Sequence, residues 1–138
     1  MGRKEARDIA FKIVYQLEFQ EQEVEQLLNN TIEEEQITNK AILEYINTVV
    51  RGIVENKELI ESKISGSLKE DWTINRISKI NIAILKVATY ELMYMEETVP
   101  NKVAINEALE LTALYGDEAD KPFINGVLAN ILKGKNND

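Results

Sequence analysis

Apolar residues recur every three or four positions along most of the chain, the spacing that places them on one face of an α-helix. The first such segment predicts a helix from Arg3 to Gln20. Its apolar stripe is expected to face the core and contains Ile9, Ala10, Ile13, Val14 and Leu17. The weaker repeat at Val24–Ile32 predicts a short second helix, and no segment shows the strict alternation of a β-strand.

A longer apolar repeat follows Thr38, a residue type that caps helix N-termini. The buried face predicted for this third helix contains Ile42, Ile46, Val49, Val50, Ile53 and Val54. The repeat allows this helix to continue through Ile60 and Ile64 and to end near Gly66. The segment Ser65–Asp71 is the predicted connection between two halves of the chain.

The second half begins with a short turn at Trp72–Ile77. Helices are then predicted over Lys79–Met95, from Pro100 to Tyr115 and from Pro122 to Lys133. Both prolines stand at helix starts, where the missing N–H would have no partner in any case. The sequence therefore predicts an all-α protein of about five to seven helices in two packed bundles. We expect a single domain, 1–138, with an N-terminal half of about 1–66 and a C-terminal half of about 72–134.

Composition narrows the chemistry of the protein. At 138 residues and 44% hydrophobic content the chain can bury a core, and it contains neither cysteine nor histidine. Disulfides, thiolate nucleophiles, imidazole bases and the common zinc ligands are therefore excluded. Asn106 and Glu107 lie together in a predicted helix, but no nucleophile or base accompanies them, so a buried hydrogen bond or partner contact is favoured. We expect a non-enzymatic protein without catalytic residues, cofactor or metal.

The charge and the N-terminus bear on location and partners. The start MGRKEARDIAF lacks the apolar core of a signal peptide, and no segment approaches the ~20 apolar residues of a membrane span. A cytoplasmic protein without membrane contact is expected. The net charge of -8 opposes bulk binding of a polyanion, so any RNA contact must be local. Residues 1–20 carry four basic and three acidic side chains, whereas residues 21–70 carry five and eleven.

Four residues of the first predicted helix follow one another at intervals of four: Arg3, Arg7, Phe11 and Tyr15. Successive members are about 40° apart around the helix and share one stripe. Guanidinium groups pair with phosphates and aromatic rings stack on unpaired bases, so the stripe could hold single-stranded RNA. The alternative is a solvated edge at the two arginines with both rings in the core, and spacing alone favours it. Of the two rings, Phe11 is the one expected in the core.

Two motifs in the second half point to a known family. The segment VPNKVAINEALEL at residues 99–111 is followed by Tyr115-Gly116 and then by KPFINGVL at residues 121–128. The same pattern includes LKVATYEL at residues 85–92, and a basic start with Ala10 and Tyr15 in the first helix. In residues, order and spacing, nearly the whole chain resembles the NusB family of bacterial transcription antitermination factors.

The resemblance implies two helical bundles and a function in transcription. A NusB protein is expected to bind boxA, a single-stranded element of ribosomal RNA transcripts, together with the ribosomal protein NusE in the RNA polymerase antitermination complex. The residues that the resemblance assigns to RNA binding are Arg3, Lys4, Arg7, Tyr15, Lys121, Phe123 and Asn125. The starts of the first and last helices are thereby expected to form one RNA groove, although Phe123 could equally close the core. Exchange of Arg7 for glutamate is expected to weaken RNA binding without unfolding the protein.

The sequence departs from the family pattern at two places, and two other functions stay open. Glu5 and Asp8 interrupt the basic N-terminal motif, and Asn81-Ile82 replaces an expected acidic and basic pair that could alter the NusE surface. One rival is the regulatory RNA-binding module of an RNA methyltransferase, but this chain has no glycine-rich cofactor loop and no cysteine nucleophile. The other is a protein-interaction scaffold, such as a homodimer, that does not bind RNA.

Overall fold

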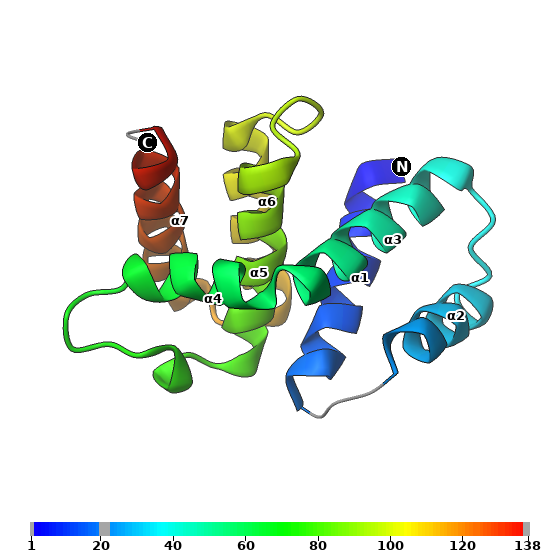
Figure 1. Ribbon diagram of the computed structural model, residues 1–138, viewed down its shortest axis with the longest axis horizontal. Helices are drawn as coiled ribbons and strands as arrows, with labels where there is room; N and C mark the ends of the chain where they lie inside the picture. Colours follow the sequence, from blue (N-terminus) through cyan, green and yellow to red (C-terminus); the bar gives the residue numbers. More distant parts are fainter. Residues whose placement is uncertain (1, 20–22, 137–138) are drawn as a thin grey trace.

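The protein is helical throughout its ordered elements. The computed structural model describes residues 2–19 and 23–136, in which no strand is present (Figure 1). Its elements are α1 (Gly2–Phe19), α2 (Val24–Glu34), α3 (Lys40–Glu55), α4 (Lys57–Gly66), η1 (Ile74–Arg76), α5 (Lys79–Tyr94), α6 (Asn101–Tyr115), η2 (Glu118–Asp120) and α7 (Lys121–Asn136). The predicted all-α class is confirmed. Gln20, the predicted end of the first helix, lies outside the described residues.

Helix starts follow from local side-chain hydrogen bonds. The Asn39 side chain accepts a hydrogen bond from the Ile42 amide at 3.1 Å and caps α3, so the predicted cap at Thr38 is wrong by one residue. At the other end of α3, the backbone leaves helical geometry at Asn56, whose Nδ2 donates to the Gly52 carbonyl at 2.8 Å. The long helix to Gly66 that the repeat allows is therefore two helices, α3 and α4.

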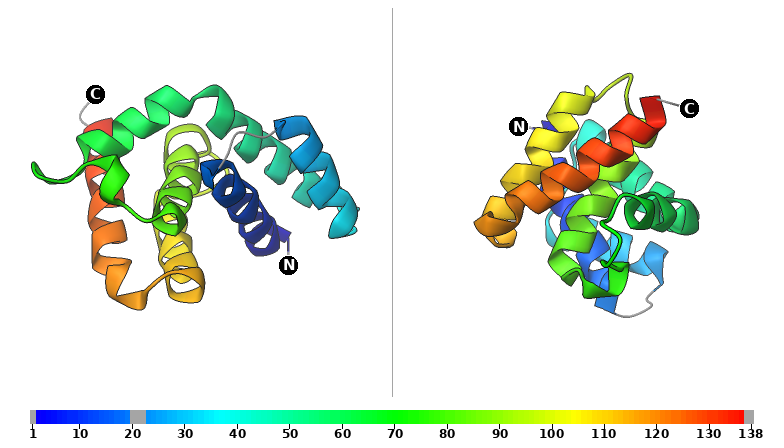
Figure 2. Two further views of the ribbon diagram at one scale, coloured as in Figure 1. Left: turned by 90° about the horizontal axis from the view of Figure 1, so that it is seen from below. Right: turned by 90° about the vertical axis from the view of Figure 1, so that its left-hand side faces the viewer.

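Helix α5 lies at the centre of the molecule. It packs against α1 and α3 on one side and against α4, α6 and α7 on the other, while α2 covers α1 and α3 (Figures 1 and 2). Every residue from Asn81 to Leu92 is buried. Because α5 contacts helices of both groups, the division into halves at 1–66 and 72–134 stays a prediction.

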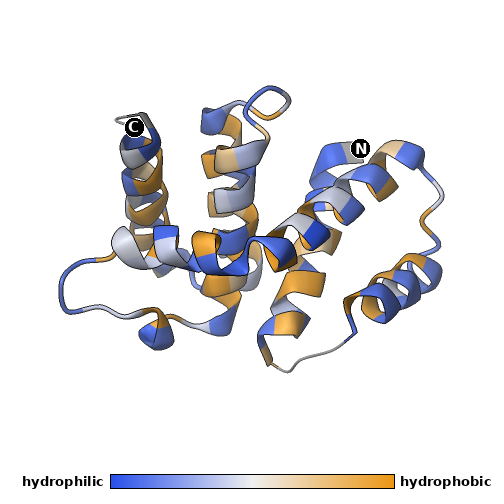
Figure 3. Cartoon of the chain, in the orientation of Figure 1, coloured by the Kyte–Doolittle hydropathy of each residue, from blue (hydrophilic) through white to orange (hydrophobic). Residues whose placement is uncertain are grey.

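The predicted core faces are largely confirmed. Ile9, Ala10, Ile13 and Val14 are buried in α1, and Leu17 is partly buried. In α3 the prediction fails only for Val54, which is exposed because it lies beyond Ile53, at the edge of the face that packs on its neighbours. Helix α2 carries both hydrophobic and hydrophilic residues (Figure 3), of which Leu27 and Leu28 are buried. Within the described ranges, no helix has both the length and the apolar content to cross a membrane.

Two glycines have opposite surroundings. At Gly52 in α3, an added Cβ would lie 2.2 Å from Cε1 of Tyr90, so only glycine lets the Tyr90 ring of α5 pack this closely. Gly126 in α7 could be expected to serve the same purpose, because a glycine inside a helix costs about 1 kcal/mol relative to alanine. However, no atom of the described residues lies within 4 Å of the position of its Cβ. Close helix approach is therefore not what glycine provides at position 126.

Candidate nucleic-acid interface

Arg7, one of the predicted RNA contacts, lies inside the protein. Its side chain is 4% exposed, and its Nε donates to Oε2 of Glu91 at 2.9 Å, while Nη1 lies 3.3 Å from Oε1 of Glu107. The Tyr45 hydroxyl donates to the same Glu91 oxygen. This buried cluster, Arg7, Tyr45, Glu91 and Glu107, joins α1 to α3, α5 and α6.

The buried cluster corrects the prediction for Arg7. Burial by itself lowers the pKa of the guanidinium, but the combined effects of Glu91, Tyr45 and Glu107 outweigh it, so the pKa of Arg7 is raised and the group stays charged. A guanidinium held by two carboxylates beneath the surface does not reach an RNA phosphate. The solvated edge weighed as the alternative is wrong for Arg7 as well. The expectation that Arg7 can become glutamate without loss of fold is therefore withdrawn.

Tyr45 should make the stability of the protein sensitive to high pH. Burial raises the pKa of the Tyr45 phenol, and the charge of Glu91 raises it further. Above the ordinary tyrosine pKa of about 10, the unfolded chain releases this proton and the folded chain keeps it. The free energy of unfolding should thus fall above pH 10, by up to about 1.4 kcal/mol per pH unit.

Urea denaturation between pH 8 and pH 11.5 measures this effect against Tyr45→Phe, which has no phenol to titrate. The pKa values of Tyr90 and Tyr115 are also raised, mainly by burial, but these residues titrate in both proteins. Only the difference in pH dependence between the parent protein and Tyr45→Phe is due to Tyr45. Parallel curves for the two proteins would contradict the assignment.

Arg3 and Lys4 are the exposed cations at the start of α1. Arg3 Nη1 donates to the Thr98 carbonyl at 3.3 Å. Lys4 Nζ donates to Oε2 of Glu110 at 2.6 Å and lies 3.6 Å from Glu107. The hydrogen bond to Glu110 raises the pKa of Lys4. Both cations are accessible, but acidic groups of α6 already neutralise part of the charge of Lys4.

An aromatic row runs along α1. Tyr15 is half-buried between Phe11, with ring centroids 6.2 Å apart, and Phe19, which it meets edge-on at 4.9 Å. Phe11 is buried and stacks on Tyr115 at 5.1 Å, so its predicted place in the core is confirmed. Tyr15 is therefore the ring of the original stripe that is both partly accessible and held in place by neighbouring rings.

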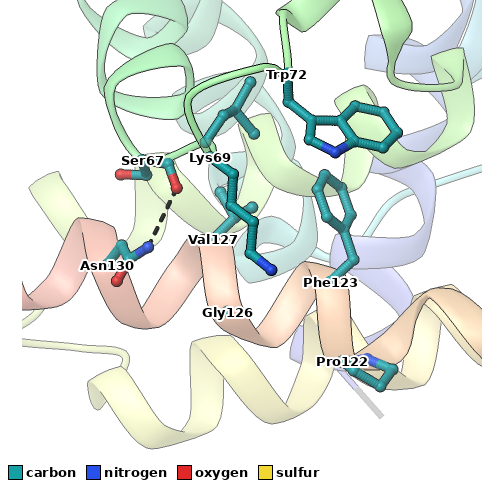
Figure 4. A pocket seen from close by; sticks show the side chains of 9 residues that line it. Ser67, Lys69, Trp72, Pro122, Phe123, Gly126, Val127 and Asn130 are labelled. Atoms are coloured by element: carbon teal, nitrogen blue, oxygen red, sulfur yellow. Dashed lines mark hydrogen bonds between the residues drawn. The ribbon is translucent and has the colours of Figure 1, made fainter.

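The second motif forms the start of α7. Lys121 is half-buried, with its Nζ 3.6 Å from Glu118, and Asn125 is exposed. Phe123 is half-buried and packs on Trp72, with ring centroids 6.0 Å apart and planes inclined by 41°. It packs against the edge of the core and also lines a surface hollow of about 320 Å³ (Figure 4).

The predicted residues belong to two sets with different neighbours. Helices α5 and α6 stand between α1 and α7 in both views (Figures 1 and 2). Arg3 and Lys4 contact the loop after α5 and helix α6, whereas Lys121 and Phe123 contact η2 and Trp72. The predicted residues therefore form two patches, one on α1 and one at the start of α7, and the single RNA groove stays a prediction.

The sequence analysis missed residues beside the second patch. Trp72 is 44% exposed, and the Arg76 guanidinium lies 5.0 Å from its ring centroid. Lys69 lines the same hollow. The sequence does carry a signal for this site, because Trp72 lies between Lys69 and Arg76 and outside any apolar repeat. The sequence analysis assigns Trp72 only to a short turn.

Known proteins match this chain along almost its full length. The NusB family model matches residues 4–133. The transcription antitermination protein NusB of Clostridium novyi is 42% identical over 135 residues, which cover 96% of this chain and 99% of the relative. The protein of the same name from Listeria monocytogenes is 38% identical over 131 residues, with 95% and 96% covered. Both relatives are named as transcription antitermination proteins, which agrees with the prediction of a non-enzymatic protein.

Solved structures agree with the sequence matches. NusB of T. maritima superposes with a TM-score of 0.87 at 36% identity, covering 96% of this chain and 92% of that one. A crystal structure of the antitermination factors NusB and NusE in complex with dsRNA has a TM-score of 0.86 at 30% identity, with 96% of both chains covered. Fold, motifs and full-length similarity agree, and the chain belongs to the NusB family.

Proposed function

We propose that this protein, as a NusB antitermination factor, binds the boxA element of ribosomal RNA transcripts together with a NusE partner. The complex would retain the RNA on elongating RNA polymerase in the cytoplasm and support processive rRNA transcription. The observation that carries the proposal is the full-length similarity to antitermination proteins, one of which has been solved with NusE and RNA.

The surface supports a divided RNA contact. Arg3, Lys4 and Tyr15 offer two cations and a ring on α1, while Lys121, Phe123 and Asn125 offer a cation, a ring and an amide at the start of α7. Three cationic contacts to single-stranded RNA give a slope of log affinity against log salt of roughly -2. This electrostatic contribution is modest in a protein of net charge -8, so a basic partner that adds contacts of its own should tighten RNA binding.

Fluorescence anisotropy with a labelled boxA RNA and a scrambled control tests the proposal. Each RNA is titrated with the protein alone and with a NusE partner at one fixed salt concentration. Preference for boxA, tightened by the partner, is the expected result. Equal weak binding to both RNAs in both conditions would overturn the proposal. The remaining function would then be that of a protein-interaction scaffold. Sedimentation of the protein alone then decides whether the scaffold is a homodimer.

Tyr15→Ala should weaken boxA binding by about 1–3 kcal/mol, the usual contribution of one base stacked on an aromatic ring. The measurement is the anisotropy titration, accompanied by circular dichroism to show that the helices remain. Tyr94→Ala is the matched control, since Tyr94 is an exposed ring at the far end of α5 that packs on Tyr90 at 4.9 Å. Equal affinities of the Tyr15 variant and the control would remove Tyr15 from the RNA surface.

A further inference from the structure

The hollow beside the second patch is built by two distant segments. Leu68, Lys69 and Trp72 come from the connection between α4 and η1, and Phe123, Val127 and Asn130 come from α7. Figure 4 shows the Lys69 side chain reaching across this hollow toward Gly126, and the Trp72 ring standing above Phe123. The volume of about 320 Å³ is enough for a single flat ring system.

Gly126 keeps the floor of the hollow open. No atom of the described residues lies within 4 Å of a Cβ at this position, so packing against another helix does not explain the glycine. A glycine inside a helix is less stable than almost any other residue. Because position 126 is a glycine, no side chain of α7 fills the hollow at this point.

The walls have the chemistry that recognises a nucleotide. Trp72 and Phe123 offer aromatic surface, and the cations Lys69 and Arg76 stand beside them, the latter 5.0 Å from the Trp72 ring centroid. Asn130 Nδ2 donates to the Ser67 carbonyl at 3.2 Å, which leaves its Oδ1 free to accept a hydrogen bond. Of the described residues that line the hollow, none is acidic. Aromatic rings with cations around them suit a flat base attached to a phosphate.

We propose that this hollow binds one unpaired base of the RNA strand, stacked against Trp72 and Phe123, with Lys69 and Arg76 beside its phosphates. The inference rests on the proposed RNA-binding function and assigns it a second base-binding position. The rings of Trp72 and Phe123 are too close to hold a base between them, so the base lies on their open side, above Gly126 and Val127. The competing occupant is an aromatic side chain of a partner protein.

Trp72 is the only tryptophan of the chain, so intrinsic fluorescence reports on the hollow directly. In a titration with the boxA RNA, a stacked base should quench this fluorescence and saturate together with the anisotropy signal. Binding seen by anisotropy without any change in tryptophan emission would overturn this inference and leave the proposed function standing. Absence of RNA binding by either measurement would instead overturn the proposed function.

Gly126→Leu and Gly134→Leu form a matched pair for the decisive measurement. Both glycines lie in α7 with open space where a Cβ would stand, and leucine should stabilise the helix at either position. Only leucine at position 126 fills the hollow. It should weaken RNA binding by roughly 5- to 150-fold, the range for loss of one stacked base, while Gly134→Leu binds like the parent protein.

Two results would overturn the inference. The first is RNA binding by Gly126→Leu equal to that of Gly134→Leu, since the filled hollow would then not matter. The second is unchanged RNA affinity of the Gly126 variant alone together with weaker binding of the NusE partner, which would assign the hollow to a protein side chain. Thermal unfolding of both variants shows that each is folded before the affinities are compared.

Discussion

Replacement of Arg7 by alanine should lower the free energy of unfolding by about 3–5 kcal/mol, the cost of leaving one member of a buried ion pair without its partner. Glu91 is fully buried, and its carboxylate would keep only the Tyr45 hydroxyl as a close partner. Urea denaturation followed by circular dichroism at neutral pH measures the loss.

Arg51→Ala provides the matched control for Arg7. Arg51 also pairs with a glutamate through its guanidinium, Nη2 to Oε1 of Glu25 at 2.8 Å, but this pair lies at the surface. Its loss should cost less than about 1 kcal/mol. Comparable losses in the two variants would show that burial of the Arg7 pair is not what makes it important. A normally stable Arg7 variant that fails to bind RNA would restore the original assignment of Arg7 to the RNA surface.

Lys86→Met should lower the free energy of unfolding by about 2–3 kcal/mol, somewhat less than the loss at Arg7. Lys86 is buried in α5, and its Nζ donates to Glu61 of α4 at 2.8 Å and to Glu18 of α1. Methionine fills the volume but leaves two carboxylates without their cation. Both carboxylates are partly exposed and can regain water, which limits the loss. The same denaturation experiment measures it.

Lys12→Met is the control for Lys86. Lys12 pairs with Asp8 one turn away on the exposed side of α1 at 3.2 Å, a contact worth about 0.3–0.5 kcal/mol. The difference between the two variants therefore measures what the buried position adds. If Lys86→Met lowers the free energy of unfolding no more than Lys12→Met does, then Glu18 and Glu61 do not need the charge of Lys86.

The helices could be predicted from the sequence because their signals are local. The apolar spacing of α5 and α6 gives their bounds to within one residue of the structure, and Asn39 differs from the predicted cap by one position. The break between α3 and α4 was missed because Asn56 is neither a proline nor a glycine, and the apolar repeat continues across it. Only the packing of α4 on α5 and α7 shows that its direction has changed.

The site could be predicted only in part because its decisive contacts are long-range. Arg7 lies on one stripe with Tyr15, as predicted, but its partner Glu91 is 84 positions away and no local pattern indicates that it is buried. Trp72 gains its significance from Phe123, which follows 51 positions later. Family motifs identify positions such as Lys121 and Asn125, yet they do not tell which of them share a surface.

The central place of α5 affects how the chain can fold during synthesis. Helices α1 and α3 pack on each other and bury the rest of their apolar faces against α5, which begins only at Lys79. A nascent chain that ends before that residue therefore leaves part of the apolar surface of its first helices uncovered, whatever their own tendency to form. Stable structure should therefore appear on the ribosome late, once α5 has emerged to cover that surface.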